Sequence, residues 1–497
     1  FVTSRRKRPS TRVSPMPGTP GAGTARAAEH AAGRMAHAAA LEHVSQALAM
    51  LDRTGDSPRQ AQAQAPLRWR LLRAREQTLD MQGERERQAT DLDAMDRVAE
   101  MLGDDARWAY AAYRRAYRAM RMAAWSECEQ SARRAVALAD AALASGAGSA
   151  VPVDADDGLH GLRLISLRLL GTATMFTGRW DDAQALLQQT LDEARARGLL
   201  KAQADCLNSL AVLAGSQDDP VRMPGLFREG LNLYRQTGDR RGEATALGNV
   251  GGAWLNLGDL AAARHDLEDG LRLTRQNGDR VAECAPLCSL SALALWQDDD
   301  ARALAFARSA LDTAMAVQAR DWEAEASTRL GDAEAALGRL APAAQAYARA
   351  AYVAHAVSSG WQFEASAGLA RLALAQGDIG GALSEVESLL LQADASAQAD
   401  AVGGPAAAGE PVAADAAEAA AASFDGAAEP RRTELTIHRV LAAAGDPRAT
   451  AWLQHAHRAL MAQANAITDA ALRQMLLTNI PYHREIVALW GQQQAAR

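Results

Sequence analysis

The sequence predicts an all-α solenoid of about 8–9 antiparallel helix pairs that repeats every 40 residues. Three observations support this prediction. Residues 241–279 form two amphipathic stretches around a glycine turn, similar stretches recur on both sides, and three residue columns keep one spacing. A regular internal period favours a single elongated array over several globular domains, whatever the chain length would allow.

The stretch 241–279 is the best-formed helix pair. Its turn is Leu257-Gly258-Asp259, which ends one helix and begins the next. Small residues in both helices let the two backbones approach closely. The positions predicted to share a stripe are Leu247, Val250, Gly251 and Trp254 in the first helix, and Ala263, Leu267, Gly270 and Leu271 in the second.

Three columns align the repeats with one another. The small helix-contact position falls at Gly171, Ala211, Gly251, Ser291, Gly331 and Ala370, in steps of 40, 40, 40, 40 and 39. Twelve residues later stand Ala183, Met223, Ala263, Ala303, Ala343 and Ala382. The turn between the two helices holds Gly178, Asp218, Gly258, Asp298, Gly338 and Gly377. An earlier repeat fits around Ala116 and Cys128, so we expect the array to cover residues 105–392, with an insertion loop at 144–158.

The flanks are less regular. Residues 1–24 are basic and rich in Pro and Gly, which predicts a disordered lead-in. Residues 25–104 predict irregular N-terminal helices, at 25–53, 66–81 and 84–102. After the array, residues 393–429 predict an Ala/Gly-rich segment that is either a disordered linker or a weak helix. Residues 430–497 predict a helix pair followed by capping helices, because a solenoid must cover its terminal face.

Composition limits the functional classes. Only Lys7 and Lys201 are lysines among 53 basic residues, a skew typical of a high-GC bacterial genome, and the net charge of −7 disfavours direct nucleic-acid binding. Four cysteines fit a reducing compartment, and no apolar run is long enough for a membrane span, so we expect a cytoplasmic protein. The chain begins with Phe1, which suggests a fragment or a misplaced start.

Catalytic motifs are missing from the sequence. A phosphate-binding loop needs Gly-x-x-x-x-Gly-Lys-Ser/Thr, and neither lysine stands in one. Cys284 and Cys288 would share a helix face, but no histidine is near them, so we favour helix packing over a metal site. His455 and His457 point to different faces of one helix and cannot chelate together. We therefore expect no enzyme activity, no cofactor and no metal.

The pattern ALGNVGGAWLNLGDLAAARHDLEDGL resembles the tetratricopeptide repeat, with small residues in helix A, Leu-Gly-Asp at the turn and alanines in helix B. Departures from the pattern are Met223 in an alanine position, Pro220 and Pro224 near a helix start, and Asp298 in a glycine position. The resemblance implies a right-handed superhelix. The 40-residue period and the flanks look like the C-terminal regions of large bacterial signal-transduction ATPases and transcriptional regulators.

Proteins with such repeats use the inner face of the A helices as a binding groove. The resemblance places nine candidate residues there: Tyr110, Tyr113, Tyr117, Arg121, Arg168, Phe176, Asn208, Asn256 and Trp296. Aromatic rings and arginines followed by amides could hold a peptide or a sugar-like ligand by stacking and forked hydrogen bonds. The alternative is that Tyr113 and Tyr117 belong to the helix core and that the arginines form a solvated face.

The expected function is recognition of a protein, a peptide or a small ligand. The array would be the sensor or docking arm of a bacterial regulator, with an ATPase or DNA-binding domain in cis if the chain is a fragment. Two alternatives remain at this stage. One is a free-standing adaptor that assembles other proteins, and the other is an enzyme with its site in the irregular terminal helices.

Overall fold

The computed structural model describes residues 37–54, 57–145, 158–217, 221–357, 359–403, 424 and 427–495. Within these ranges the chain forms twenty-one α-helices, one short 3-10 helix and no strand, which confirms the predicted all-α repeat fold. The chain divides into two compact units: residues 1–80 with 86–104, and residues 81–85 with 105–497. The predicted lead-in at residues 1–24 lies outside the described residues.

Three helices account for residues 37–104: α2 (His37–Thr54), α3 (Pro58–Gln82) and α4 (Arg85–Leu102). The prediction that the second of these begins at Pro66 is wrong, because Pro66 lies inside α3. The helix begins at Pro58 instead, and a proline fits a first helical position because the N–H that it lacks has no helical partner there. Leu92, Met95 and Val98 lie on one buried face of α4.

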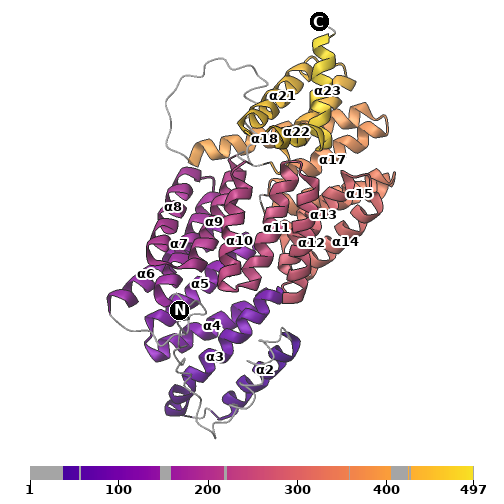
Figure 1. Cartoon of the computed structure of the whole chain (residues 1–497). Helices are drawn as coiled ribbons and strands as arrows, with labels where there is room; N and C mark the ends of the chain where they lie inside the picture. The colour runs from indigo at the N-terminus through magenta and orange to yellow at the C-terminus, as the bar shows by residue number, and fades with distance from the viewer. Residues whose placement is uncertain are drawn as a thin grey trace, which may run out of the picture. The chain divides into compact units, whose positions relative to one another are not determined.

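Seven consecutive helical hairpins follow, and Figure 1 shows α7 to α13 standing side by side in chain order. Their helices are α5 (Asp105–Arg121), α6 (Trp125–Ala144), α7 (Gly158–Phe176), α8 (Trp180–Arg197), α9 (Leu200–Ser216), α10 (Met223–Thr237), α11 (Arg240–Asn256), α12 (Leu260–Asn277), α13 (Cys284–Leu295), α14 (Asp300–Ala316), α15 (Arg320–Ala336), α16 (Leu340–Ala356), α17 (Trp361–Ala375) and α18 (Ile379–Gly403). A 3-10 turn, η1 (Val281–Glu283), precedes α13. Pro224 is the second residue of α10, where a proline does not interrupt the helix.

The small-residue column marks where the two helices of each hairpin touch. A Cβ added at Gly251 would lie 2.6 Å from the Leu267 side chain, closer than side-chain atoms normally approach. For the three glycines of the column, the large residue comes sixteen positions later, on the second helix: Leu187 for Gly171, Leu267 for Gly251 and Tyr347 for Gly331. In the Ser291 repeat the hydroxyl instead donates to the Ala303 carbonyl at 2.9 Å. The 40-residue period therefore reflects repeated close helix contacts.

The described residues of the turn column take a left-handed backbone conformation between the two helices of each hairpin. Its described glycines have positive φ: Gly178 (+80°), Gly258 (+78°), Gly338 (+72°) and Gly377 (+77°). Asp298 takes the same left-handed conformation, with φ +58°, whereas Asp218 lies outside the described residues. A second column ends the second helices, where Gly198, Gly238 and Gly278 have positive φ and Gln318 replaces glycine at φ +53°. A residue other than glycine is strained in this conformation.

Gln318→Gly is therefore expected to stabilise the protein by roughly 0.5–1 kcal/mol, because relief of the backbone strain exceeds the entropy that glycine adds to the unfolded chain. Urea unfolding of the full chain, followed by circular dichroism, measures the effect. Gln376→Gly is the control, since exposed Gln376 also ends a helix but has φ −85°. A destabilisation of equal size in both variants would contradict the strain at Gln318.

Four further helices follow: α20 (Pro430–Ala443), α21 (Ala449–Ala466), α22 (Ala470–Thr478) and α23 (Pro481–Ala495). Helices α20 and α21 pack on α17 and α18 through a cluster that contains Val386, Ile437 and Trp452. The structure describes parts of the segment 393–429, for which we expected a disordered linker or a weak helix. Helix α18 continues to Gly403, and Phe424 is buried between Phe363 and Trp452, with ring centroids 5.4 and 5.8 Å away.

A buried charge network, centred on Asp332 of α15, connects the array to the start of α20. Asp332 accepts hydrogen bonds from both terminal nitrogens of Arg432, at 2.6 and 2.8 Å, and from the Tyr347 hydroxyl at 2.5 Å. Arg371 of α17 reaches the same carboxylate at 3.4 Å. Burial alone would raise the pKa of Asp332, but Arg432 and Arg371 hold that pKa far below its usual range. These contacts join α15, α16, α17 and α20.

The C-terminal helices also contact the middle of the array, which the prediction did not include. The Asn479 side-chain amide donates to the Gly258 carbonyl at 3.0 Å, and a Cβ at Gly258 would lie 2.4 Å from the Met475 carbonyl oxygen. Leu257 is buried in one hydrophobic cluster with Leu476 and Ile480. The turn between α11 and α12 is therefore covered by α22.

Candidate functional site

A pocket of about 350 Å³ lies on the face formed by the first helices of four successive hairpins, α5, α7, α9 and α11. We call it the aromatic–arginine pocket. Its lining includes five cations, Arg114, Arg121, Arg168, Lys201 and Arg241, and five aromatic residues, Tyr113, Tyr117, Trp125, Phe176 and Tyr234. The other polar lining residues are Thr172, Asp205, Asn208, Ser209, Asp239 and Thr245. Because first helices line up in the array, residues about 40 positions apart meet here.

Six of the nine residues predicted from the sequence line this pocket: Tyr113, Tyr117, Arg121, Arg168, Phe176 and Asn208. The other three do not. Tyr110 is buried beside Tyr113, with ring centroids 5.9 Å apart. Asn256 is exposed at the end of α11, and Trp296 packs edge-on against Tyr482 of α23 at 6.0 Å. The C-terminal helices thus occupy the position that we expected Trp296 to offer to a ligand.

The sequence reasoning missed several lining residues. Lys201 is the clearest case, because it is one of only two lysines in the chain and the other is Lys7. Ser209 stands 41 positions after Arg168, and Asn249 stands 41 positions after Asn208, which accepts a hydrogen bond from it at 2.8 Å. A search for polar residues 41 positions apart, one more than the period, would have found both pairs, although Asn249 itself does not line the pocket. No such signal marks Trp125 or Tyr234, which come from second helices.

Arg168 is one of the buried cations of the pocket. It is 9 % exposed, and its Nη1 donates to the Ser209 hydroxyl at 3.2 Å. Its Nε is buried and donates to no atom of the described residues. Burial opposes the charged form of Arg168, but charge interactions, of which that with Asp205 is the largest, together outweigh burial, so the Arg168 pKa lies above its usual value. The guanidinium therefore stays charged inside the pocket.

Two carboxylates on the pocket wall are already engaged. Asp205 accepts a hydrogen bond from the Tyr234 hydroxyl at 2.5 Å. Asp239 pairs with Lys201 and also caps α11 by accepting from the Gly242 N–H at 2.9 Å. Burial acts against the Lys201 charge, but Asp205 and Asp239 raise the Lys201 pKa overall. Both residues therefore hold the pocket wall in shape as well as contributing charge.

Arg121 and Arg241 share a partner outside the pocket lining. Asp279 accepts from Arg121 Nη2 at 3.1 Å and from Arg241 Nε at 2.7 Å. Both guanidinium carbons also lie near the Tyr117 ring, at 6.0 and 5.8 Å from its centroid, and Arg114 lies at 5.0 Å. Tyr117 is therefore surrounded by positive charge, an arrangement that cation–π attraction stabilises.

The rim of the pocket is aromatic. Trp125 and Phe176 stack with ring centroids 4.1 Å apart and planes inclined by only 7°. Phe176 nevertheless remains 47 % exposed. An apolar ring held flat at the edge of a charged pocket is a surface on which a ligand side chain can stack.

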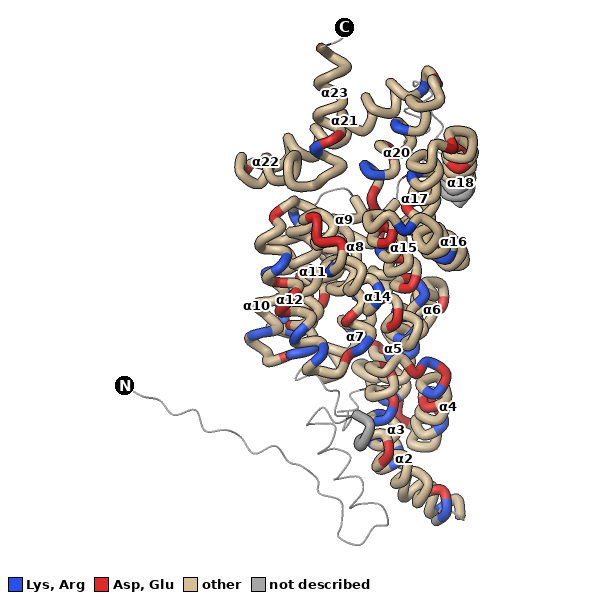
Figure 2. The backbone as a smooth tube through the Cα atoms, turned by 90° about the vertical axis from the view of Figure 1, so that its right-hand side faces the viewer, with Lys and Arg blue, Asp and Glu red and all other residues tan. Residues whose placement is uncertain are grey.

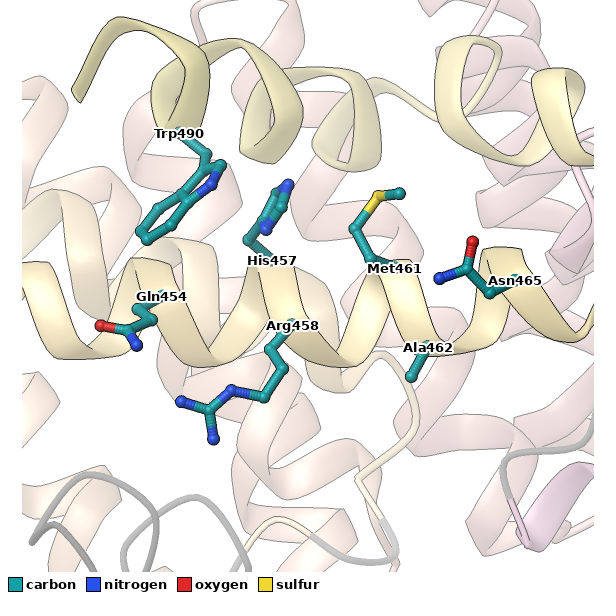
Figure 3. Close-up of a pocket in the computed structure, with 7 residues that line it drawn as sticks. All are labelled: Gln454, His457, Arg458, Met461, Ala462, Asn465 and Trp490. Carbon is teal, nitrogen blue, oxygen red and sulfur yellow. The ribbon is translucent and has the colours of Figure 1, made fainter. Parts of the chain in front are cut away.

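A second pocket, of about 480 Å³, lies between α21 and α23 and is lined by Gln454, His457, Arg458, Met461, Ala462, Asn465 and Trp490. Figure 3 shows Trp490 and His457 side by side, with Arg458 pointing away from α23. The His457 and Trp490 rings stack at 5.0 Å, and burial lowers the His457 pKa. This pocket has a single cation, at its edge, and offers less chemistry than the first.

The cysteines take part in packing. Cys284 and Cys288 are buried on α13, where Cys288 lies in one cluster with Leu267 and Leu287. Burial raises the pKa of the Cys284 thiol to about 12. Among the described residues, no three His, Cys, Asp or Glu side chains form a metal-binding group. No helix in the described ranges has the length and hydropathy that a membrane crossing needs.

Comparison with known proteins gives similarity at the level of structure. No family profile matches the chain, and no curated protein matches it in sequence. A solved Rap protein complexed with competence and sporulation factor is 12 % identical over 79 % of this chain and 100 % of its own, with a TM-score of 0.49. Aspartyl phosphate phosphatase F from Bacillus subtilis is 12 % identical over 71 % of this chain and 96 % of its own, with a TM-score of 0.44.

A third solved structure is a signal transduction ATPase with numerous domains and a tetratricopeptide repeat sensor, from Pyrococcus horikoshii. It is 13 % identical over 71 % of this chain, with a TM-score of 0.40, and this chain spans about half (52 %) of its length. All three TM-scores lie below 0.5, and our assignment of the fold rests on the hairpin register described above.

Proposed function

We propose that the chain is a non-catalytic binding scaffold that recognises a protein or peptide partner in the aromatic–arginine pocket. The observation that carries this proposal is the gathering of five cations and five aromatic residues in one pocket of about 350 Å³. Pockets of this size that combine apolar walls with a few placed polar groups are typical binding sites. Since consecutive first helices supply the walls, an extended segment could lie across several repeats.

Recognition without turnover fits the protonation states of the pocket. A general acid or base works best with a pKa near the operating pH. Burial raises the pKa of the Tyr113 and Tyr234 hydroxyls, and the pKa of Lys201 is also raised, whereas Lys201 lowers the pKa of Asp239 against the effect of burial. These four groups are all shifted away from neutrality, so they are suited to holding fixed charges and hydrogen bonds.

In this proposal the array acts as the sensor or docking arm of a regulator. A bound segment that touches α5, α7, α9 and α11 together would favour one arrangement of these helices over others, and this difference in affinity is what a regulator can transmit. The ATPase with a tetratricopeptide sensor is an example of such a layout in another protein. An adaptor that only brings partners together would use the same pocket without transmitting a change.

Peptide display against the purified full chain tests the proposal, followed by measurement of the dissociation constants of the enriched peptides. Thr245→Trp should weaken their binding at least tenfold, because Thr245 is an exposed residue of the pocket wall and the indole would fill the space. Gln189→Trp is the control, since it adds the same bulk at an exposed position of α8. Equal binding by both variants, or no enriched peptide, would overturn the proposal.

A further inference from the structure

We infer that the aromatic–arginine pocket takes an acidic segment of its partner, with a carboxylate at Arg168 and an apolar or aromatic side chain against the Trp125–Phe176 stack. This inference rests on the proposed function and specifies the chemistry of the segment. Three features of the pocket support it: the local excess of positive charge, the buried Arg168 Nε, and the exposed ring at the rim.

The charge excess is local. The pocket is lined by five cations and two carboxylates, a surplus of three positive charges, while the chain as a whole carries a net charge of −7. Elsewhere in the array basic and acidic residues are interspersed along the helices, as Figure 2 shows. Asp279 offsets part of the surplus through Arg121 and Arg241. An anionic ligand would therefore meet a lining in which cations outnumber carboxylates, whereas a basic ligand would add like charge to it.

Arg168 identifies where the anion belongs. The charge of Asp205 favours the Arg168 cation, but Asp205 accepts the Tyr234 hydroxyl at 2.5 Å and makes no hydrogen bond to the buried Arg168 Nε. The hydroxyls of Ser209 and Thr172 lie 3.3 Å apart next to the guanidinium. Arginine binds carboxylates through parallel N–H donors, and a carboxylate at this point would receive the buried Nε–H.

The rim explains why the occupant is a peptide rather than a free anion. An inorganic anion would fill the charged floor but would leave the Phe176 ring, 47 % exposed and stacked on Trp125, without a role. A peptide brings a carboxylate and a neighbouring side chain on one backbone. Both ends of the pocket are then used, because α7 carries Arg168 about two helical turns before its last residue, Phe176.

The experiment uses the rarity of lysine. Reductive methylation of the full chain with ¹³C-formaldehyde labels only the N-terminal amine, Lys7 and Lys201, and it preserves the charge. Lys201 lines the pocket and so reports occupancy by a shift of its methyl signal. The probes are blocked peptides with two glutamates beside a phenylalanine in a Gly/Ser frame, counterparts with Glu→Gln or Phe→Ala, and inorganic phosphate.

The Glu–Glu–Phe peptide should shift the Lys201 signal, and the Glu→Gln counterpart should bind at least tenfold more weakly. The Phe→Ala counterpart should bind the wild-type chain several-fold more weakly than the parent peptide does. To the variant Phe176→Ala, which changes an exposed position, the two peptides should bind equally well. Because the decisive changes are made in the ligand, a loss of binding cannot come from misfolding. Arg168→Gln, with its fold checked by circular dichroism, should no longer distinguish Glu from Gln.

Two results would overturn the inference. Inorganic phosphate that shifts the Lys201 signal as strongly as the acidic peptide, at equal concentration, would show that a free anion is the ligand. The display experiment could also yield peptides that Thr245→Trp no longer binds but whose affinity is unchanged by Glu→Gln. Such peptides would leave the proposed function intact and show that the pocket does not recognise acidic side chains. If no peptide binds in the pocket at all, the proposed function itself fails.

Discussion

Asp332→Ala is expected to lower the free energy of unfolding by about 3–5 kcal/mol, because removing one partner of a buried charge network leaves the other charges uncompensated. The Asp332 side chain is 4 % exposed, and its loss would remove a carboxylate from Arg432 and Arg371 and the acceptor of the Tyr347 hydroxyl. Arg432 would keep its ion pair with Glu429 at 3.0 Å. Urea unfolding of the full chain gives the size of the effect. Hydrogen exchange in α20 should rise at the same time, since Arg432 anchors that helix.

The loss of stability in Asp332→Ala should depend on pH. The Asp332 pKa is depressed in the folded protein, so its contribution is complete above the unfolded value of about 3.9 and is lost as the pH falls toward the folded value. The difference between wild type and variant should therefore be constant from pH 7 to pH 5 and shrink below about pH 4. Asp312→Ala, at an exposed position of α14, is the control and should change stability by less than about 0.5 kcal/mol. A small effect at Asp332 would mean that the network does not anchor α20.

Gly258→Ala is expected to cause the second largest loss of folding stability, because alanine would introduce both backbone strain and a steric clash. A residue other than glycine at φ +78° costs roughly 1–2 kcal/mol, and the new Cβ would stand 2.4 Å from the Met475 carbonyl oxygen. The turn would have to distort, or α22 would have to move away. We expect a total loss of about 3 kcal/mol, which includes part of the hydrophobic contact of Leu257 with Leu476.

Gly178→Ala separates the two reasons. Gly178 occupies the same position in an earlier repeat with φ +80°, and nothing lies within 4 Å of an added Cβ. The loss of stability that Gly258→Ala shows beyond Gly178→Ala therefore measures the docking of α22. Limited proteolysis should cut between α21 and α23 faster in Gly258→Ala only. Identical losses in the two variants would show that α22 does not hold the turn.

The repeat array could be predicted from the sequence because the residue types within each repeat determine how its two helices contact. Gly251 leaves space for the Leu267 side chain, so the two helices can contact closely, and an equivalent close contact recurs at Gly171 and Gly331. The folding back of α22 could not be read, since no period links Asn479 to Gly258, 221 positions earlier. The same applies to Phe424, which sits in an alanine-rich stretch without any helical pattern.

The candidate site was predicted in part for the same reason. Tyr113, Arg168 and Asn208 could be placed on first helices by register, and they line one pocket. Trp296 was placed by the same rule, but a helix from outside the register covers its ring. Register gives the face on which a side chain lies, whereas access to that face depends on the whole chain.

The contact between Asn479 and Gly258 also has a consequence for biosynthesis. In a simple array each hairpin needs only its neighbours, so it can become stable as soon as the next one has been made. Here the apolar turn at Leu257 is covered by residues that are 221 positions further along, and at about 5–20 residues per second the ribosome needs roughly 11–44 s to reach them. During that interval the nascent chain exposes a surface that chaperones recognise, and the finished array closes only when α22 arrives.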